Sequence, residues 1–491
     1  MKNIFKKSII LLIVVLMGSC SKDRFSLAPI TSLGELQAFD TKDRIVGQVN
    51  GMYAMMKSGN FLGGRFYVYN DVRADNFIPK STNLVTNYAT WNHSLVSSTN
   101  EVQNLWGAAY AAINAINIFI EGLDKNWTDG KLTGIITEAE YKQFKGEALA
   151  LRAISYFSML QLYAQPYNKD AGASLGLPLR LIAYKTGADN DMARSTVAQV
   201  YTQILLDLNT AEPMVAANFA TALLNTTRVH KNTIIAYKTR VYLHMNDFPK
   251  VQLEAAKMVP VAAPFVSPSG VANALSATFA GVFASPYTSA ESIFSMPFTS
   301  TNLAGTQNSL AHYHHPSSSE SYFLNRAAGG IYSQMITGDA RKTILATGTV
   351  AAQTEYFCGK YTNFTSQVDY APVIRYAEVL LNYAEAKVRG ANAVTQSAVD
   401  LLNAVRVRSY PAGVYTLASF ASVQAFRDAI ILERSFEFLG EGIRNMDLLR
   451  NMLTIPTKGG VSAVAPTSPT YIWPIPTTEL VINKLMVGNG N

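Results

Sequence analysis

The sequence predicts a mostly α fold in which paired helices are joined by long polar loops, and three observations support this. Apolar residues recur at intervals of three and four in residues 138–163 and again after residue 370, the spacing of one helical face. Two further helical segments meet at the short break Asn246-Asp247, which is the arrangement of a tetratricopeptide-like helix pair. Residues 260–335 are rich in Ser, Thr, Pro, Gly and Ala with isolated aromatics, which is typical of a long ordered loop region.

Each predicted helix has identifiable residues at its ends. Serine is a favoured N-cap, so we expect Ser195 to precede a helix that Thr196 opens. Pro249 is tolerated in a first turn and is expected to open a helix after the break at 246–247. The remaining segments predicted as helices are 107–120, 138–163, 231–245, 374–390, 395–408 and 422–450.

Composition excludes a nucleic-acid partner. The 491 residues are 48% hydrophobic, enough to bury a core without disulfides or metals. The net charge is +7, and without Lys2, Lys6 and Lys7 it falls to +4. That charge is too small and too dispersed for binding to a phosphate backbone. Charged residues make up only 15% of the chain, against about 25% in average proteins, so we expect polar, neutral surfaces.

The first twenty residues predict a lipid-anchored protein. A basic start leads into an apolar run from Ile9 to Met17, which is too short to span a bilayer and fits a secretory signal peptide. Small residues then precede Cys20, so residues 1–19 are expected to be a lipoprotein signal peptide, Cys20 the lipidated residue and 20–34 a tether. The alternative is a plain secretory signal that contains a cysteine. The other cysteine, Cys358, is expected to be a small buried or half-buried side chain.

Three groups of polar residues contain residue types that also occur in catalytic or metal-binding sites. Glu433, Glu437 and Glu441 are spaced on one predicted helix, where an ion-pair network fits better than the flanking carboxylates of a glycosidase. His312, His314 and His315 lack zinc-ligand spacing and favour a polar or ligand-facing loop. Residues 69–77 lack the spacing of an EF-hand calcium loop. We therefore expect no metal and no cofactor, and predict that Trp106, Tyr110 and Trp473 belong to the core.

Several segments together resemble the SusD/RagB family of Bacteroidetes outer-membrane lipoproteins. They are GEALALRAISYFSMLQLY (146–163), RSTVAQVYTQILLDLNTA (194–211), SAESIFSMPF (289–298), APVIRYAEVLLNYAEA (371–386), LLNAVRVRS (401–409), ILERSFEFLGEGIRNMDLLR (431–450) and WPIPTTEL (473–480). They occur in the family order behind the cysteine of the signal. The run Ser21-Lys22-Asp23 resembles the charged tag that sends such lipoproteins to the outer face.

The resemblance implies a fold, a partner and a function. The fold would be a tetratricopeptide-like helical scaffold with long loops and a few short strands, with 35–215 as an N-terminal SusD-like region and 216–491 as a C-terminal RagB/SusD region packed into one globular unit. The protein would sit on a SusC-like TonB-dependent barrel, in the outer membrane and facing the exterior, and pass oligosaccharides to it without catalysis. Peptide binding, as in RagB-like proteins, and a surface glycoside hydrolase remain as alternatives.

The resemblance places the glycan site in two regions, and residue types select candidates within them. A neutral glycan needs an aromatic platform together with amides and carboxylates. The predicted site consists of Trp91 as platform with Asn92 and His93 beside it, Asp71, Arg73 and Asn76 as hydrogen-bonding groups, and Tyr287 and Tyr313 closing the opposite side.

Overall fold

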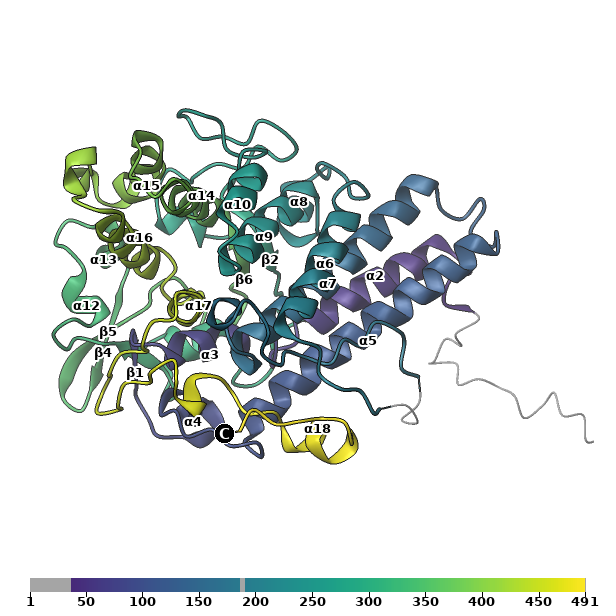
Figure 1. Ribbon diagram of the computed structural model, residues 1–491, viewed down its shortest axis with the longest axis horizontal. Helices are drawn as coiled ribbons and strands as arrows, with labels where there is room; N and C mark the ends of the chain where they lie inside the picture. The colour runs from purple at the N-terminus through teal and green to yellow at the C-terminus, as the bar shows by residue number, and fades with distance from the viewer. Residues whose placement is uncertain (1–36, 186–189, 491) are drawn as a thin grey trace, which may run out of the picture.

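The computed structural model describes residues 37–185 and 190–490, and helices dominate this part of the chain, as the sequence predicts (Figure 1). The longer helices are α2 (Lys42–Met56), α5 (Asn100–Thr128), α6 (Glu138–Tyr163), α7 (Val197–Ala211), α9 (Lys231–His244), α14 (Tyr376–Ala391), α15 (Gln396–Ser409) and α16 (Val423–Glu437). The shorter helices are α3 (Arg65–Arg73), α4 (Tyr88–Trp91), α8 (Ala222–Thr227), α10 (Phe248–Ala255), α11 (Leu310–His314), α12 (Ile331–Gln334), α13 (Ala340–Thr343), α17 (Ile443–Arg450) and α18 (Thr477–Ile482). The predicted signal peptide, Cys20 and the tether lie outside the described residues.

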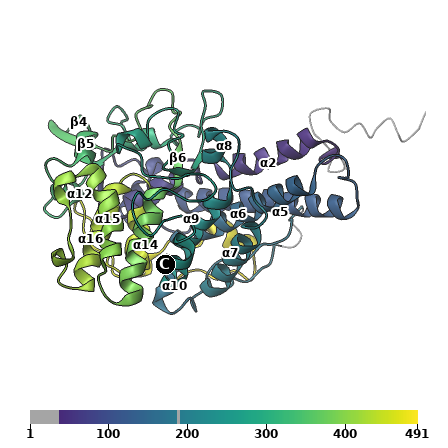
Figure 2. The same ribbon diagram turned by 90° about the horizontal axis from the view of Figure 1, so that it is seen from above.

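Helices that follow one another in sequence pack together, as in tetratricopeptide-like scaffolds. Helix α6 packs against α7, α9 against α10 and α14 against α15, while contacts between α7 and α9 and between α10 and α14 join the pairs (Figures 1 and 2). One hydrophobic cluster reaches from Phe39 to Met486. The scaffold therefore surrounds a continuous core.

Helix α6 shows how the sequence determines such an element. Thr137 accepts a hydrogen bond from the Glu140 backbone N–H, and the Glu140 side chain accepts one from the Thr137 N–H, which is a capping box. Every residue of α6 from Gly146 to Tyr163 is buried, because α2, α5, α7 and α9 all contact this helix. The helix predicted most clearly from periodicity thus lies at the centre of the molecule.

Short strands tie the loops to this scaffold. Strands β1 (Phe77–Pro79), β3 (Tyr322–Leu324), β5 (Gln353–Phe357) and β4 (Ala346–Val350) form an antiparallel sheet in the order β1-β3-β5-β4. Strand β2 (Ser292–Met296) pairs antiparallel with β6 (Ala371–Arg375). The second pair holds the long loop region 260–335 against the start of α14, since β6 runs directly into that helix.

Several predicted helix ends differ from those in the structure. Thr196, not Ser195, is the N-cap of α7, because its side chain accepts a hydrogen bond from the Gln199 N–H. Ile374 continues the helical spacing but belongs to β6, and α14 starts only at Tyr376. The predicted helix 422–450 is two helices, since the chain turns between α16 and α17 at Gly440 and Gly442, with φ of 80° and 72°, a conformation that glycine adopts without strain.

Candidate functional site

The structure corrects most of the predicted ligand site. Five of the eight predicted side chains are buried, namely Trp91, Asp71, Arg73, Asn76 and Tyr313, while Asn92, His93 and Tyr287 are half-buried. The first five are therefore packed into the scaffold, and the structure does not bring the eight together around one open cleft.

Trp91 is part of the core, not an open platform. Its indole Nε1 donates to the Phe77 carbonyl oxygen at 2.8 Å, and its ring stacks on Tyr88 with centroids 5.5 Å apart. The ammonium of Lys458 lies 5.7 Å from the ring centroid, and only 5% of Trp91 is exposed. No ring face remains for a sugar, so the expectation of an exposed indole is corrected.

The other buried members satisfy structural hydrogen bonds. Asp71 Oδ1 accepts from the Gly442 N–H at 3.0 Å, and Arg73 donates to the Thr470 carbonyl oxygen at 2.6 Å. The Tyr313 hydroxyl donates to the Gln307 carbonyl oxygen at 2.7 Å. Burial, with Lys458 and Arg73 nearby, lowers the pKa of His93 to about 2. These residues join α3 and its neighbours to distant segments of the chain.

Tyr287 is the predicted residue that lies in a pocket wall. The narrow pocket is lined by Val282, Phe283, Tyr287, Ser292, Ser295, Lys360, Tyr361, Asp369, Tyr370, Pro372 and Arg375. The Tyr287 and Tyr370 rings stack with centroids 4.8 Å apart. Asn363 Nδ2 donates to the Tyr287 hydroxyl oxygen and to Asp369 Oδ1, each at 2.7 Å. A stacked aromatic pair is thus held beside an amide and a carboxylate.

A second aromatic group is centred on Phe364, which follows Asn363 in the chain. The Phe364 ring stacks on His315 with centroids 5.4 Å apart and an interplanar angle of 8°, and on His312 with centroids 6.4 Å apart. All three side chains are half-buried, and Asn363 joins Phe364 to the tyrosine pair. We call these seven residues, Tyr287, His312, His315, Asn363, Phe364, Asp369 and Tyr370, the loop cluster.

Local strain and desolvation mark the tyrosine side of the loop cluster. Tyr287 has a φ of 64°, a left-handed conformation that costs a bulky side chain on the order of 1 kcal/mol or more and recurs at functional sites. Burial, with Asp369 nearby, raises the pKa of Tyr287 to about 12, and burial also raises the pKa of Asp369. At neutral pH the tyrosine is therefore a neutral hydroxyl that can donate and accept hydrogen bonds.

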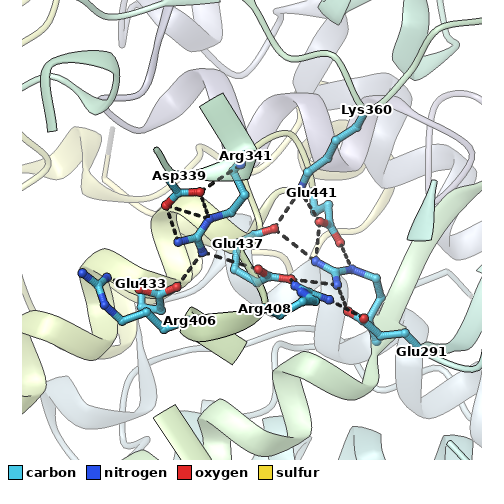
Figure 3. Close-up of polar contacts among 10 residues, drawn as sticks. Glu291, Asp339, Arg341, Lys360, Arg406, Arg408, Glu433, Glu437 and Glu441 are labelled. Carbon is cyan, nitrogen blue, oxygen red and sulfur yellow. Dashed lines mark hydrogen bonds and ion pairs between the residues drawn. The ribbon is translucent and has the colours of Figure 1, made fainter. Parts of the chain in front are cut away.

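A buried ion-pair network, drawn in Figure 3, includes Lys360 and Arg375, which also line this pocket. Arg375 pairs with Glu291, Glu437 and Glu441, and Lys360 donates to Glu441. Arg408 also bridges Glu291 and Glu437. Because Lys360 and Arg375 are held by this network, the part of the pocket wall that they form is fixed in position.

The ion-pair network predicted for Glu433, Glu437 and Glu441 is confirmed, with partners that the sequence did not indicate. Glu433 binds Arg341 and Arg406, and Arg341 also pairs with Asp339. The two arginines nearest to these glutamates in sequence, Arg434 and Arg444, pair with Asp447 and Asp75 instead. Glu441 also lies beyond the end of α16, in the turn before α17.

Metal ligation finds no support in the described residues. Within 37–185 and 190–490, no group of three or more His, Cys, Asp or Glu side chains could hold a metal ion. Of the three clustered histidines, His314 is fully buried, while His312 and His315 flank Phe364. Cys358 is buried, and Trp106 and Trp473 belong to the core, as predicted, whereas Tyr110 is only partly buried and packs against the core.

Sequence reasoning missed four members of the loop cluster, namely Asn363, Phe364, Asp369 and Tyr370. They come from KYTNFTSQVDY (360–370), between β5 and β6. This segment has no helical or strand periodicity. The available signal was its composition, because aromatic, amide and acidic residues together in one loop are typical of sugar-binding surfaces.

Comparison with known proteins identifies the family. A family model described as starch-binding and associating with the outer membrane matches residues 29–243, and a model described as the SusD family matches residues 347–491. A crystal structure of a SusD superfamily protein from Bacteroides fragilis is 30% identical, with a TM-score of 0.80, and the match covers 91% of this chain and 99% of that one. The chain belongs to the SusD family.

Two further relatives show how widely the SusD fold is shared. SusD-like protein P38 of Formosa agariphila is 23% identical over 99% of both chains. Surface glycan-binding protein A from Bacteroides thetaiotaomicron, solved in complex with laminarihexaose, is 19% identical with a TM-score of 0.71, over 92% of this chain and all of that one. At these identities the likeness concerns the fold.

Proposed function

We propose that this SusD-family chain is a non-catalytic, lipid-anchored protein of the outer membrane that binds a neutral glycan and passes it to a TonB-dependent, SusC-like transporter. The observation that carries the proposal is the loop cluster, where the stacked rings of Tyr287 and Tyr370 lie beside Asn363 and Asp369, and Phe364 follows Asn363 in the chain. Ring faces match the flat C–H faces of sugars, and amide and carboxylate groups match their hydroxyls. The laminarihexaose complex of a relative with the same fold adds support.

The state of the acidic residues favours binding over hydrolysis. A glycoside hydrolase places two carboxyl groups on either side of the scissile bond. Glu433 and Glu437 are 1% and 0% exposed and are occupied by Arg341, Arg406 and Arg408. These carboxylates cannot reach a sugar without breaking the ion-pair network, so we assign them a structural role.

The binding experiment removes one ring of the loop cluster. The full chain in detergent is screened against a neutral panel of hexasaccharides of glucose, mannose, xylose and galactose, with laminarihexaose included. Phe364→Ala should weaken binding of the preferred oligosaccharide by about 1–3 kcal/mol, measured by titration calorimetry. Phe364 is half-buried, so its replacement by alanine should leave the fold intact.

The matched control is a stacked tyrosine outside the loop cluster. Tyr332 and Tyr356 stack with centroids 4.1 Å apart, so Tyr332→Ala removes a comparable ring and should leave affinity unchanged. Equal affinities of wild type and Phe364→Ala would remove the loop cluster as the glycan site. Binding to a peptide library, with none to the neutral panel, would favour the RagB-like alternative.

Partnership with a transporter needs its own experiment. The full chain should co-purify with a TonB-dependent barrel when it is isolated from the native outer membrane in mild detergent. A second lipoprotein from the same membrane serves as the control for non-specific capture. Repeated isolation of the chain without any barrel would contradict the transfer step and leave glycan binding untouched.

A further inference from the structure

A second groove lies on the outer surface of α5, between that helix, α18 and the segment around Arg180. It has a volume of about 320 Å³, within the range of small-ligand sites. It shares no lining residue with the pocket of the loop cluster. The Trp106 indole joins two of its walls, because Nε1 donates to Glu479 Oε2 of α18 at 3.2 Å.

The floor of this α5 groove is open because its residues are small. Gly107 and Ala111 are exposed and one helical turn apart on α5. A Cβ atom added at Gly107 would meet nothing within 4 Å. A glycine inside a helix is less stable than an alanine, so at this position the open space comes at the expense of helix stability.

The walls combine half-buried rings with one fixed ion pair. Tyr110 and Tyr184 are both half-buried. The Arg180 guanidinium lies 5.0 Å from the centroid of the Tyr184 ring and 3.2 Å from Glu479 Oε1. The two charges that line the groove cancel, so it presents a neutral surface of aromatic rings and hydrogen-bonding groups. The exposed Thr478 at its edge adds a hydroxyl.

We propose that the α5 groove is a second binding site for neutral saccharides. The Tyr110 and Tyr184 rings take the C–H faces of a sugar, and the planar guanidinium of Arg180 donates to hydroxyl oxygens while Glu479 holds it in place. A ligand with net charge gains nothing from a paired Arg–Glu, which is why the groove fits an uncharged ring. This inference rests on the proposed glycan-binding function and adds a separate location to it.

The test fills the groove without disturbing the core. Gly107→Leu places a side chain in the open floor, and Gly107→Ala is the matched control that changes the helix in the same direction and leaves most of the space. Both are made in the Phe364→Ala background, which weakens the loop cluster, and titrated in the full chain with the members of the neutral panel that wild type binds. Residual binding should fall at least tenfold in Gly107→Leu and remain in Gly107→Ala.

A second variant checks the ring contribution. Tyr184→Ala should weaken residual binding, while Tyr184→Phe, which keeps the ring, should retain it. Tyr383 provides an equivalent tyrosine elsewhere, with Lys387 located 4.3 Å from its ring centroid, and Tyr383→Ala should have no effect.

The outcomes separate the two proposals. Identical residual binding in Gly107→Leu and Gly107→Ala, or complete loss of binding in Phe364→Ala alone, overturns the α5 groove and leaves the proposed function standing. Absence of binding to every member of the neutral panel by wild type overturns the proposed function, and the groove with it.

Discussion

At the residue scale, burial decides which candidate side chains are available to a ligand. The residue type of Trp91 fits a sugar platform. Its indole is nevertheless buried by contacts with Phe77 and with Lys458, which is far away in sequence. No local sequence pattern around residue 91 could predict that the Trp91 side chain is buried. Tyr287 lies in a pocket wall, whereas Tyr313 of the same loop region is buried, so residue type within a Ser/Thr-rich loop does not decide exposure.

Replacement of Trp91 should therefore affect stability and not the glycan site. Trp91→Ala removes a buried indole and its hydrogen bond to Phe77, and should lower the free energy of unfolding by about 3–5 kcal/mol. The milder Trp91→Phe should cost less and leave affinity for the neutral panel unchanged. Urea denaturation and calorimetric titration of the same preparation measure both quantities. A folded Trp91→Phe with weakened glycan binding would restore Trp91 to the site.

At the residue scale, Glu101 should make the stability of the fold depend on pH. Its Oε2 accepts hydrogen bonds from the backbone N–H and the hydroxyl of Thr90, and burial, opposed by Thr90 and Arg65, raises the pKa of Glu101 to about 7. Between the ordinary glutamate pKa of 4.5 and about 7, the folded chain keeps a proton that the unfolded chain has released. The contribution of Glu101 to the free energy of unfolding is therefore fully present below about pH 4.5. It falls as the pH rises to 7, by up to about 3 kcal/mol.

Glu101→Gln should abolish that slope. Urea denaturation at pH 5, 6, 7 and 8 should show wild type losing stability relative to the variant over this range. Parallel pH profiles for the two proteins would show that Glu101 keeps an ordinary pKa in the fold.

At the element scale, the sequence predicts the helices well and their partners poorly. Periodicity located α6 and α9 to within a residue of their ends, because these helices are built from local spacing and capping. The same spacing predicts that a helix already includes Ile374, but this residue belongs to β6 because that segment pairs with β2. Sequence patterns do not reveal the loop cluster, because the Tyr287–Tyr370 stack is a contact between residues far apart in the chain, which no local pattern encodes.

At the element scale, the ion-pair network should contribute strongly to the free energy of unfolding. Burial alone would raise the pKa of Glu437, but Arg408, Arg375 and Arg341 lower it to about 2. Glu437→Gln removes a charge that faces three guanidinium groups, and should lower the free energy of unfolding at pH 7 by about 3–5 kcal/mol. The control is Glu138→Gln, which removes one partner of the exposed pair with Lys142 and should produce no measurable change. Equal free energies of unfolding for Glu437→Gln and Glu138→Gln would show that the network does not stabilise the fold.

At the scale of the whole molecule, the described residues share one large hydrophobic core. No helix within 37–185 or 190–490 is long and apolar enough to span a bilayer. One hydrophobic cluster joins residues from both of the matched family regions. Attachment to the outer membrane, which the family association implies, is therefore proposed to depend on the chain before residue 37, where the sequence predicts a lipidated cysteine.

Replacement of that cysteine is the decisive test of membrane attachment. Cys20→Ala removes the thiol that directly follows the predicted signal peptide, so it should abolish acylation and move the protein from the membrane fraction to the soluble fraction. A clickable palmitate label and fractionation of the native cells measure the two effects. Cys358→Ala is the control, because that thiol is buried, burial raises its pKa to about 11 and it should play no part in acylation. Since acyl chains supply about 0.8 kcal/mol per buried methylene and stable anchoring needs more than one chain, loss of Cys20 should release the protein almost completely. Label on Cys20→Ala, or its retention in the membrane at high salt, would assign anchoring to another part of the molecule.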